Sequence, residues 1–339
     1  MKTAIVGASG YAGTELLRLL LDHPNFEPTA ITAHSNAGEL ISSVAPHLAK
    51  LGDRRFESFD LAKVNACDLV FLALPHGESA ALIAQLAPSL KVVDLGADFR
   101  LTSAEKWAQY YGGTHAGTWT YGLPELPGNR AVIAKSTRVA NPGCYATSIS
   151  LAIAPALTLI DTSDIVVVAA SGTTGAGRSA KVNLLGSEVM GSLSSYKFGG
   201  VHQHTPEIEE ALSHAAGSEV KISFTPILAP MPRGILSTVT AKLTTTATTE
   251  TVHSLYTTVY AADEFVTVLP IGQMPKTNSV VGSNHVHLQV AVDPHTNRLI
   301  VSAAIDNLGK GAASQAIQNA NLICGLPENT GLATLGLGV

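Results

Sequence analysis

The segment Asn141–Cys144 places a cysteine directly after a Pro-Gly pair. Pro and Gly favour a turn, and the residues that follow indicate a helix that begins at or near Cys144. A helix N-terminus lowers the pKa of a thiol, because the thiolate then lies at the positive end of the helix dipole. Cys144 is therefore the predicted nucleophile of a covalent mechanism. The other two cysteines, Cys67 and Cys324, are predicted to be inert core residues.

Two histidines, His202 and His204, lie two residues apart in the glycine-rich segment 199–207. A covalent mechanism needs a proton donor, and histidine titrates in the right range. One of the pair is the predicted acid–base group. The preceding Gly-Gly favours His202, although the pattern hardly separates the two. A metal site is disfavoured because no third ligand has suitable spacing, so we predict no metal.

The segment Ser171–Arg178 follows a strongly apolar run and is rich in hydrogen-bond donors. It ends in a guanidinium group, and such a loop suits an anionic part of a substrate. Arg100, Lys181 and Arg233 are further cationic candidates, and Arg100 follows the predicted end of a strand. The predicted substrate-binding residues are Arg100, Ser171, Gly172, Arg178, Glu207 and Arg233.

Glycines recur at every third position in the segment 7–13, between a predicted strand and a predicted helix. Side chains at such a turn would keep a pyrophosphate from the N–H groups of the helix N-terminus. The pattern predicts a dinucleotide site. The predicted cofactor-binding residues of this turn are Gly7, Ser9, Gly10, Tyr11 and Gly13.

The second strand, predicted at 28–33, bears on which dinucleotide binds. NAD sites usually have an acidic residue at its end, which holds the ribose 2′-OH. Here His34-Ser35-Asn36 follow the strand, and the next acidic residue is Glu39. A carboxylate would repel a 2′-phosphate, whereas Ser35 and neighbouring amides could bind it. We therefore expect NADP, with Ser35 as a ligand. The alternative is an acidic residue displaced from the expected position.

The surrounding elements predict an α/β fold with two parts. Strands and helices alternate up to about residue 140, as in a Rossmann-type, doubly wound parallel sheet. Strands then dominate, including Ile165–Ala170, Ile235–Leu243 and Leu299–Ile305, as in an α+β domain. A final helix is predicted at 310–324.

Composition limits the class of protein. The chain has 339 residues, 46% of them hydrophobic and 14% charged, with a net charge of −5. It is long enough for about two domains. No basic stretch interleaved with aromatics suggests nucleic acid, and no apolar run is long enough to span a membrane. The N-terminus reads as a strand and the cysteines form no disulfide pattern, so we expect a cytoplasmic protein.

Over nearly its whole length the sequence resembles the N-acetyl-γ-glutamyl-phosphate reductases, which are related in fold to aspartate-semialdehyde dehydrogenase. The matching segments are Gly7–Gly13, Val93–Leu101, Tyr121–Leu126, Asn141–Thr147, Ser171–Arg178, Gly200–Ile208, Pro230–Ile235 and Asp306–Ala312. One departure is Gln203, which stands where the family often has Arg between the paired histidines.

The resemblance implies three segments: an NADP-binding domain over residues 1–143, an inserted α+β catalytic and dimerisation domain over 144–309, and a helix at 310–339 that returns to the first domain. It implies that Cys144 is the nucleophile and that the histidine segment supplies the acid–base group. Asn307 and Lys310 would lie near the returning chain, Asn307 as a cofactor ligand. A homodimer or homotetramer is expected.

The implied reaction is the NADPH-dependent reduction of an acyl phosphate to an aldehyde in arginine biosynthesis, as in a phosphorylating aldehyde dehydrogenase. Two alternatives stay open. The substrate could be another acyl phosphate, such as aspartyl phosphate or a carrier-bound glutamyl or aminoadipyl phosphate. The chain could also be a non-catalytic NADP-sensing protein.

Overall fold

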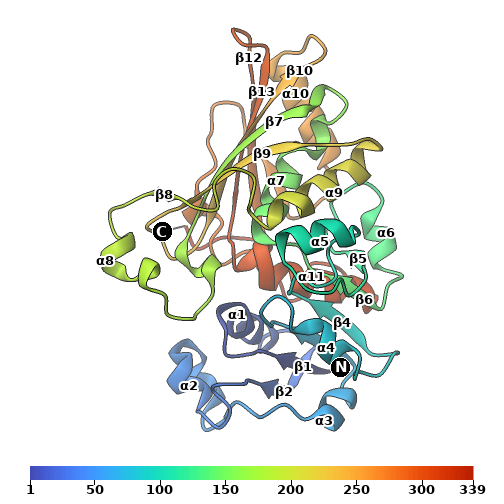
Figure 1. Cartoon of the computed structure of the whole chain (residues 1–339), viewed down its shortest axis with the longest axis vertical. Helices are drawn as coiled ribbons and strands as arrows, with labels where there is room; N and C mark the ends of the chain where they lie inside the picture. Colours follow the sequence, from blue (N-terminus) through green and yellow to red (C-terminus); the bar gives the residue numbers. More distant parts are fainter. Residues whose placement is uncertain (339) are drawn as a thin grey trace. The chain divides into compact units, whose positions relative to one another are not determined.

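The computed structural model describes residues 1–338, and their contacts divide them into two compact units (Figure 1). The first unit consists of Met1–Pro124, Gly128–Pro142 and Ala312–Leu332. The second consists of Glu125–Pro127, Gly143–Gly311 and the segment that begins at Ala333. The chain therefore passes between the units several times.

The first unit is built on a six-stranded, all-parallel sheet with the order β2-β1-β3-β4-β6-β5. Its strands are β1 (Lys2–Val6), β2 (Glu27–Thr32), β3 (Leu69–Leu72), β4 (Lys91–Asp94), β5 (Thr120–Tyr121) and β6 (Arg138–Ala140). Its helices are α1 (Tyr11–Leu20), α2 (Ile41–Val44), α3 (Leu61–Asn65), α4 (Ser79–Ile83), α5 (Ala104–Tyr110), α6 (Asn129–Ile133) and α11 (Ser314–Ile323).

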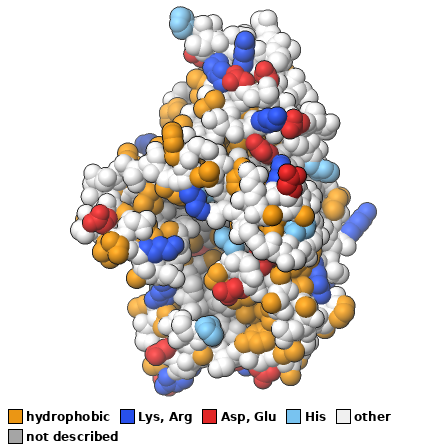
Figure 2. Space-filling view, viewed as in Figure 1, with side chains coloured by type: hydrophobic (Ala, Val, Ile, Leu, Met, Phe, Trp, Pro, Cys, Tyr) orange, Lys and Arg blue, Asp and Glu red, His pale blue; other side chains and the backbone are white. Residues whose placement is uncertain are grey.

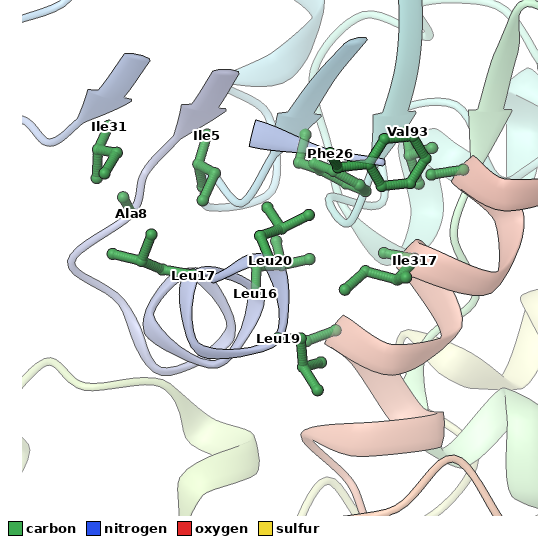
Figure 3. Close-up of a cluster of buried hydrophobic side chains, with 14 of the residues drawn as sticks. Ile5, Ala8, Leu16, Leu17, Leu19, Leu20, Phe26, Ile31, Val93 and Ile317 are labelled. Carbon is green, nitrogen blue, oxygen red and sulfur yellow. The ribbon is translucent and has the colours of Figure 1, made fainter. Parts of the chain in front are cut away.

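Both faces of this sheet are buried, because neighbouring residues of each strand enter different cores. Ile5, Ile31 and Val93 lie in one core with side chains of α1 and α11, such as Leu16 and Ile317. Figure 3 shows these side chains pointing toward one another across the layer between the sheet and the helices. The residues beside them in sequence lie in the other core: Ala4, Val6, Ala30 and Val92. This pattern is that of a doubly wound sheet.

The second unit is built on a seven-stranded mixed sheet with the order β11-β12-β13-β10-β7-β9-β8. Its strands are β7 (Ile160–Ser171), β8 (Ser194–Ser195), β9 (Ile222–Leu228), β10 (Ile235–Leu243), β11 (Val266–Val268), β12 (Val286–Asp293) and β13 (Arg298–Ile305). Its α-helices are α7 (Cys144–Ile153), α8 (Gly186–Val189), α9 (His204–Ala216) and α10 (Thr249–Val259).

Helices cover one face of the second sheet. Helix α7 packs on β10 and β13, and α10 packs on β12. The interior strand β7 alternates accordingly: Ile165 and Val167 are buried, whereas Val166 and Val168 are 37% and 43% exposed. The face opposite the helices therefore presents apolar side chains to the surroundings.

The predicted fold class, a Rossmann-type domain with an α+β second domain, is confirmed. The units differ from the expected segments in three places. Residues 125–127 and Gly143 belong to the second unit, although they lie within the predicted first domain. The expected returning segment 310–339 is divided, because only Ala312–Leu332 belongs to the first unit.

The start of the predicted final helix is irregular. Residues Gly309–Ala313 form a short π-helix, and the α-helix α11 begins only at Ser314. The prediction of one regular helix over 310–324 was therefore wrong at its first turn. Among the described residues, none of the helices has both the length and the apolar character needed to cross a membrane.

Candidate active site

The glycine turn of the first unit connects β1 to α1 and has no room for side chains at two positions. Gly7 has φ +88°, and a Cβ atom there would lie 2.3 Å from the carbonyl oxygen of Ala73. A Cβ atom on Gly13 would lie 2.4 Å from the Gly7 oxygen. Gly10 has more space, since its Cβ atom would come no nearer than 3.7 Å to that oxygen. Close backbone packing therefore requires glycine at positions 7 and 13, whereas Gly10 leaves space beside the start of α1.

Helix α1 begins directly after this turn. Its N-cap residue is Gly10, no side chain caps the helix, and its first turn contains no acidic residue. N–H groups at such a helix end attract anions. The predicted residues Gly7, Ser9, Gly10, Tyr11 and Gly13 thus lie together around an end that fits a pyrophosphate.

Ser35 lies beyond the end of β2 and is exposed, with its hydroxyl donating to the side-chain oxygen of Asn36 at 3.3 Å. The sequence reasoning missed a nearby acidic residue, Glu57, whose backbone pairs with Thr32 at the end of β2. The Glu57 carboxylate forms an ion pair with Lys63. Because Glu57 is distant in sequence, only the chain fold reveals this pairing.

In the second unit, Cys144 is the first residue of α7, as the turn before it predicted. The N-cap residue of α7, Gly143, is extended (φ −69°, ψ 150°), and no side chain caps the helix. Cys144 is partly exposed, whereas the nine residues that follow it in the helix are buried. The thiol is thus the accessible group at the positive end of a buried helix.

Glu207 joins this helix to α9. Its carboxylate is 2% exposed and accepts the backbone N–H of Gly143 at 2.7 Å. The predicted substrate residue Glu207 therefore holds the N-cap of the cysteine helix.

The two histidines differ in their surroundings. His202 is 6% exposed, and its Nδ1 accepts the backbone N–H of His204 at 3.1 Å, which leaves the proton of a neutral ring on Nε2. Burial, and then the neighbouring His204 and Lys197, lower the pKa of His202 to about 2. His202 is consequently neutral throughout the physiological range. His204 is partly exposed and begins α9.

Aromatic rings surround His202. Tyr145, Tyr196 and Phe224 each meet its ring edge to face, with centroids 5.4, 5.7 and 5.2 Å away. The Tyr196 hydroxyl donates to that of Tyr145 at 3.1 Å. Burial, together with the charge of Cys144, raises the pKa of Tyr196 to about 12, so these phenols lie within electrostatic reach of the sulfur.

The segment Ser171–Arg178, the predicted anion loop, packs closely on the segment before β10. A Cβ atom on Gly172 would lie 2.8 Å from the Pro232 oxygen, and the Gly172 N–H donates to Gly234. Ser171 is buried at the end of β7, and its hydroxyl donates to the Gly172 carbonyl. Arg178, at the far end of the loop, is exposed. The loop is therefore fixed at its start, and Arg178 at its far end is exposed.

Arg233 forms an ion pair with a buried carboxylate. Its Nε and Nη2 donate to the two oxygens of Asp306 at 3.0 and 2.6 Å. Asp306 is fully buried and also accepts the N–H groups of Gly282 and Leu308. The structure thus places this predicted substrate residue in a bidentate ion pair that joins β10 to the end of β13.

Asn307 is likewise held inside the second unit. Its side-chain oxygen accepts the Gly234 N–H at 2.7 Å, and its amide donates to the Thr174 hydroxyl at 3.0 Å. These bonds clamp the anion loop.

The π-helix that follows lies against the cysteine. A Cβ atom on Gly311 would lie 2.7 Å from the Cβ of Cys144. Lys310, the residue before it, is fully buried and donates to Glu125 at 2.6 Å. The position of Cys144 is therefore limited by glycine packing, which no local sequence pattern indicated.

Arg100 lies in the first unit and is 7% exposed. Its Nε donates to the Asn141 carbonyl at 2.8 Å and its Nη2 to the Leu95 carbonyl at 2.7 Å. Asn141 also donates to Ala312 and accepts from Asn319. Arg100 thus braces the turn that precedes Cys144.

Sequence reasoning brought Cys144, His202, His204 and Glu207 into one site, and the second unit does join them through α7 and α9. It missed Tyr145, although that residue lies in a segment that matches the family, and Tyr196, which lies in none. It also missed Asp306, although that residue lies in a segment singled out for its resemblance.

Two family models match the chain and define its class. The semialdehyde dehydrogenase NAD binding domain matches residues 2–136, and the semialdehyde dehydrogenase dimerisation domain matches residues 144–307. Solved structures share the fold. The aspartate semialdehyde dehydrogenase II of Vibrio cholerae, complexed with ASA, has a TM-score of 0.72 at 15% identity and covers 95% of this chain and 98% of that one. The Candida albicans aspartate semialdehyde dehydrogenase with NADP has a TM-score of 0.68 at 16% identity, with the same coverage.

Curated relatives are much more similar in sequence. The N-acetyl-γ-glutamyl-phosphate reductase of Acidothermus cellulolyticus is 58% identical over 99% of this chain and 98% of its own length. That of Streptomyces avermitilis is 54% identical over 99% of each chain. The chain belongs to the N-acetyl-γ-glutamyl-phosphate reductase family, as its motifs suggested. It is an oxidoreductase with a nicotinamide dinucleotide-binding domain.

Proposed function

We propose that this chain reduces N-acetyl-γ-glutamyl phosphate to N-acetylglutamate 5-semialdehyde and phosphate, with NADPH, in arginine biosynthesis in the cytoplasm. The observation that carries the proposal is Cys144 at the first position of a buried helix, with Glu207 holding the N-cap of that helix and His204 beginning the adjoining helix α9. Full-length relatives that bear this enzyme's name support the choice of substrate.

Cys144 is the proposed nucleophile. Its thiolate forms a C–S bond to the acyl carbon, and the C–O bond to phosphate breaks, with the electron pair leaving on phosphate. A reduced nicotinamide, held by the turn at residues 7–13, would supply the hydride for reduction of the thioester. Collapse of the reduced thioester breaks the C–S bond, releases the aldehyde and regenerates the thiolate.

His204 is the better candidate for the acid–base group, although the Gly-Gly pair before His202 favoured the other ring. The reaction consumes one proton, which the leaving phosphate takes up. A donor must be protonated near neutral pH, whereas His202 has a pKa of about 2 and its Nδ1 already accepts a hydrogen bond. His204 is partly exposed. It can take the proton of the Cys144 thiol and deliver it to phosphate, while His202 positions the start of α9.

Each predicted substrate-binding residue is given a proposed role according to its surroundings. The open end of the anion loop, with Arg178, is the proposed site for the acyl phosphate. Ser171 and Gly172 fix the start of that loop, and Arg233, whose side chain is held by Asp306, lies in the segment 231–234 that accepts hydrogen bonds from the loop backbone. Arg100 acts as a positioning residue for the cysteine turn.

NADP is the proposed cofactor, held by the turn residues Gly7, Ser9, Gly10, Tyr11 and Gly13. Ser35, exposed beyond β2, is the proposed ligand of the 2′-phosphate. The Glu57 carboxylate does not repel the 2′-phosphate, because its charge is neutralised by Lys63. The role of Asn307 as a cofactor residue stays a prediction. Turnover should be at least tenfold more efficient with NADPH than with NADH, and equal use of both would contradict the proposal.

A homodimer or a homotetramer is the proposed assembly. The uncovered face of the second sheet, with Val166 and Val168, is the proposed contact. A second apolar surface lies on the segment around α8, where Figure 2 shows hydrophobic side chains at the left of the molecule. Its exposed residues are Val182, Leu185, Met190, Leu193, Phe198 and Val201.

Replacement of the nucleophile tests the mechanism. Cys144→Ser should lower kcat by at least about 10³-fold, because a hydroxyl is not ionised near neutral pH. NADPH binding, followed by the change in its fluorescence, should persist. Cys324→Ser is the matched control and should retain activity. Appreciable turnover by Cys144→Ser would refute the covalent mechanism.

The alternatives have direct tests. Aspartyl phosphate and carrier-bound acyl phosphates are compared with the proposed substrate by NADPH oxidation. A non-catalytic NADP-binding protein would show no turnover with any of them, and its Cys144 would be alkylated no faster than cysteine in a peptide.

A further inference from the structure

The second unit contains a groove at the ends of its catalytic helices that lie away from Cys144 and His204. The groove has a volume of about 540 Å³. This volume falls within the range of small-ligand sites, roughly 300–1,000 Å³. Helix α7 alone separates the groove from Cys144 by roughly 15 Å, at 1.5 Å per residue. The groove is therefore distinct from the site of the reaction.

Helix C-termini converge on this groove. Its lining includes Ala215 and Ala216 at the end of α9, Val259 at the end of α10, and Ala154 and Pro155 directly after α7. A helix C-terminus carries a partial negative charge, equivalent to about half an elementary charge. The ends therefore combine to give a negative potential in the groove.

Carbonyl groups of α9 are available there. The helix ends at the left-handed Gly217 (φ 67°), which makes none of the hydrogen bonds that usually close a helix. No hydrogen-bond donor among the described residues reaches the carbonyl oxygens of Ala215 or Ala216. A ligand that donates hydrogen bonds would satisfy these oxygens.

The remaining walls lack positive charge. Among the described residues, no lysine, arginine or histidine lines the groove, and the one acidic residue there, Glu125, is neutralised by Lys310. Pro127, Leu157 and the side chain of Val259 supply apolar surface. The walls thus suit a short aliphatic stem with a cationic, donor-rich head.

We propose that this groove binds a small organic cation with a short aliphatic stem, such as an alkylguanidinium or alkylammonium ion. The head group donates to the carbonyls at the end of α9, and the stem lies on the apolar wall. The negative helix ends favour a cation over a neutral molecule of the same shape. Nothing in this assignment depends on the proposed reaction.

Calorimetric titration of the full-length protein with n-butylguanidinium tests the proposal. Saturable binding is expected, and it should weaken as salt is raised, because charge contributes to it. N-butylurea has nearly the same shape without the charge, and we expect it to bind at least tenfold more weakly. Equal binding of the two compounds, or no saturable binding of the cation, would overturn the proposal.

A substitution in the wall locates the site. Val259 is 44% exposed, so Val259→Lys should fold and should place a competing cation in the groove. We expect it to weaken n-butylguanidinium binding at least tenfold with kcat unchanged. Val132→Lys, at a 53% exposed position on α6, is the matched control and should bind as the wild type does. Equal affinities of the two variants would show that the cation binds elsewhere and would refute the site.

Discussion

At the residue scale, neighbouring histidines have been given different properties by burial. The ring of His202 is enclosed by aromatic side chains, and its pKa is lowered to about 2, so it is neutral when the enzyme works. His204 is only partly buried. Residue type and spacing could predict the pair but could not divide the roles, because burial is a property of the folded chain.

This difference predicts separate effects on pH dependence. In His204→Asn the part of the kcat/KM pH profile that depends on the acid–base group should disappear, with a loss of about 10²–10⁴-fold. In His202→Asn that part should remain, because a ring that is already neutral does not titrate there. Initial rates from about pH 5 to 9 measure both profiles. Loss of that part only in His202→Asn would reverse the assignment.

Asp94, at the end of β4, is a residue whose burial works against stability. One of its oxygens accepts bonds from Ser79 and Gly96, and the other has no partner among the described residues. Burial raises the pKa of this carboxyl from 3.8 to about 6. The folded state thus holds the proton more tightly than the unfolded state, and stability falls as pH rises from about 4 to 6.

Asp94→Asn should remove this dependence. Relative to the wild type, its free energy of unfolding should be larger at pH 7.5 than at pH 4, by up to about 3 kcal/mol for a shift of roughly two pKa units. Urea denaturation at the two pH values measures the difference. Asp22→Asn, at an exposed position, should show none. A constant difference between Asp94→Asn and the wild type would contradict the expected shift.

At the element scale, the sequence predicted the long strands and α1 well, because hydrophobic periodicity and the glycine turn specify them locally. Strand β10 was predicted with its observed bounds, Ile235–Leu243. The short elements β5, β8 and β11 were missed, since their two or three residues carry little pattern. The π-helix at 309–313 was missed because its irregularity comes from packing.

That π-helix gives a prediction about Cys144. A methyl group at Gly311 would lie 2.7 Å from the Cys144 Cβ, so Gly311→Ala must displace the nucleophile or the π-helix. We expect kcat/KM to fall at least tenfold and stability to fall by about 1–3 kcal/mol, the usual cost of overpacking. Rates of Cys144 alkylation and turnover measure the effect.

Gly186→Ala is the control for this substitution, since its Cβ atom would meet nothing nearer than 3.6 Å. It should retain both rates. If Gly311→Ala also retained them, Gly311 would have no part in positioning the cysteine.

At the scale of the whole molecule, the uncovered face of the second sheet predicts self-association. Val168→Asp places a charge in the centre of this face, where Val168 is 43% exposed and its backbone pairs with Thr238 of β10. We expect the dissociation constant of the dimer to rise at least tenfold, as measured by sedimentation velocity over a range of concentrations. Val132→Asp is the control. An unchanged assembly in Val168→Asp would place the contact elsewhere.

The order in which the units are completed has a consequence for synthesis on the ribosome. Helix α11 packs in one core with Ile5 and Ile31, yet it lies at residues 314–323. At roughly 5–20 residues per second, the strands of the first sheet wait for about 10 to 40 s until this helix has been made. During that time one apolar face of the sheet lacks part of its cover. The nascent chain is therefore a natural client for a chaperone that shields exposed hydrophobic surface until translation ends.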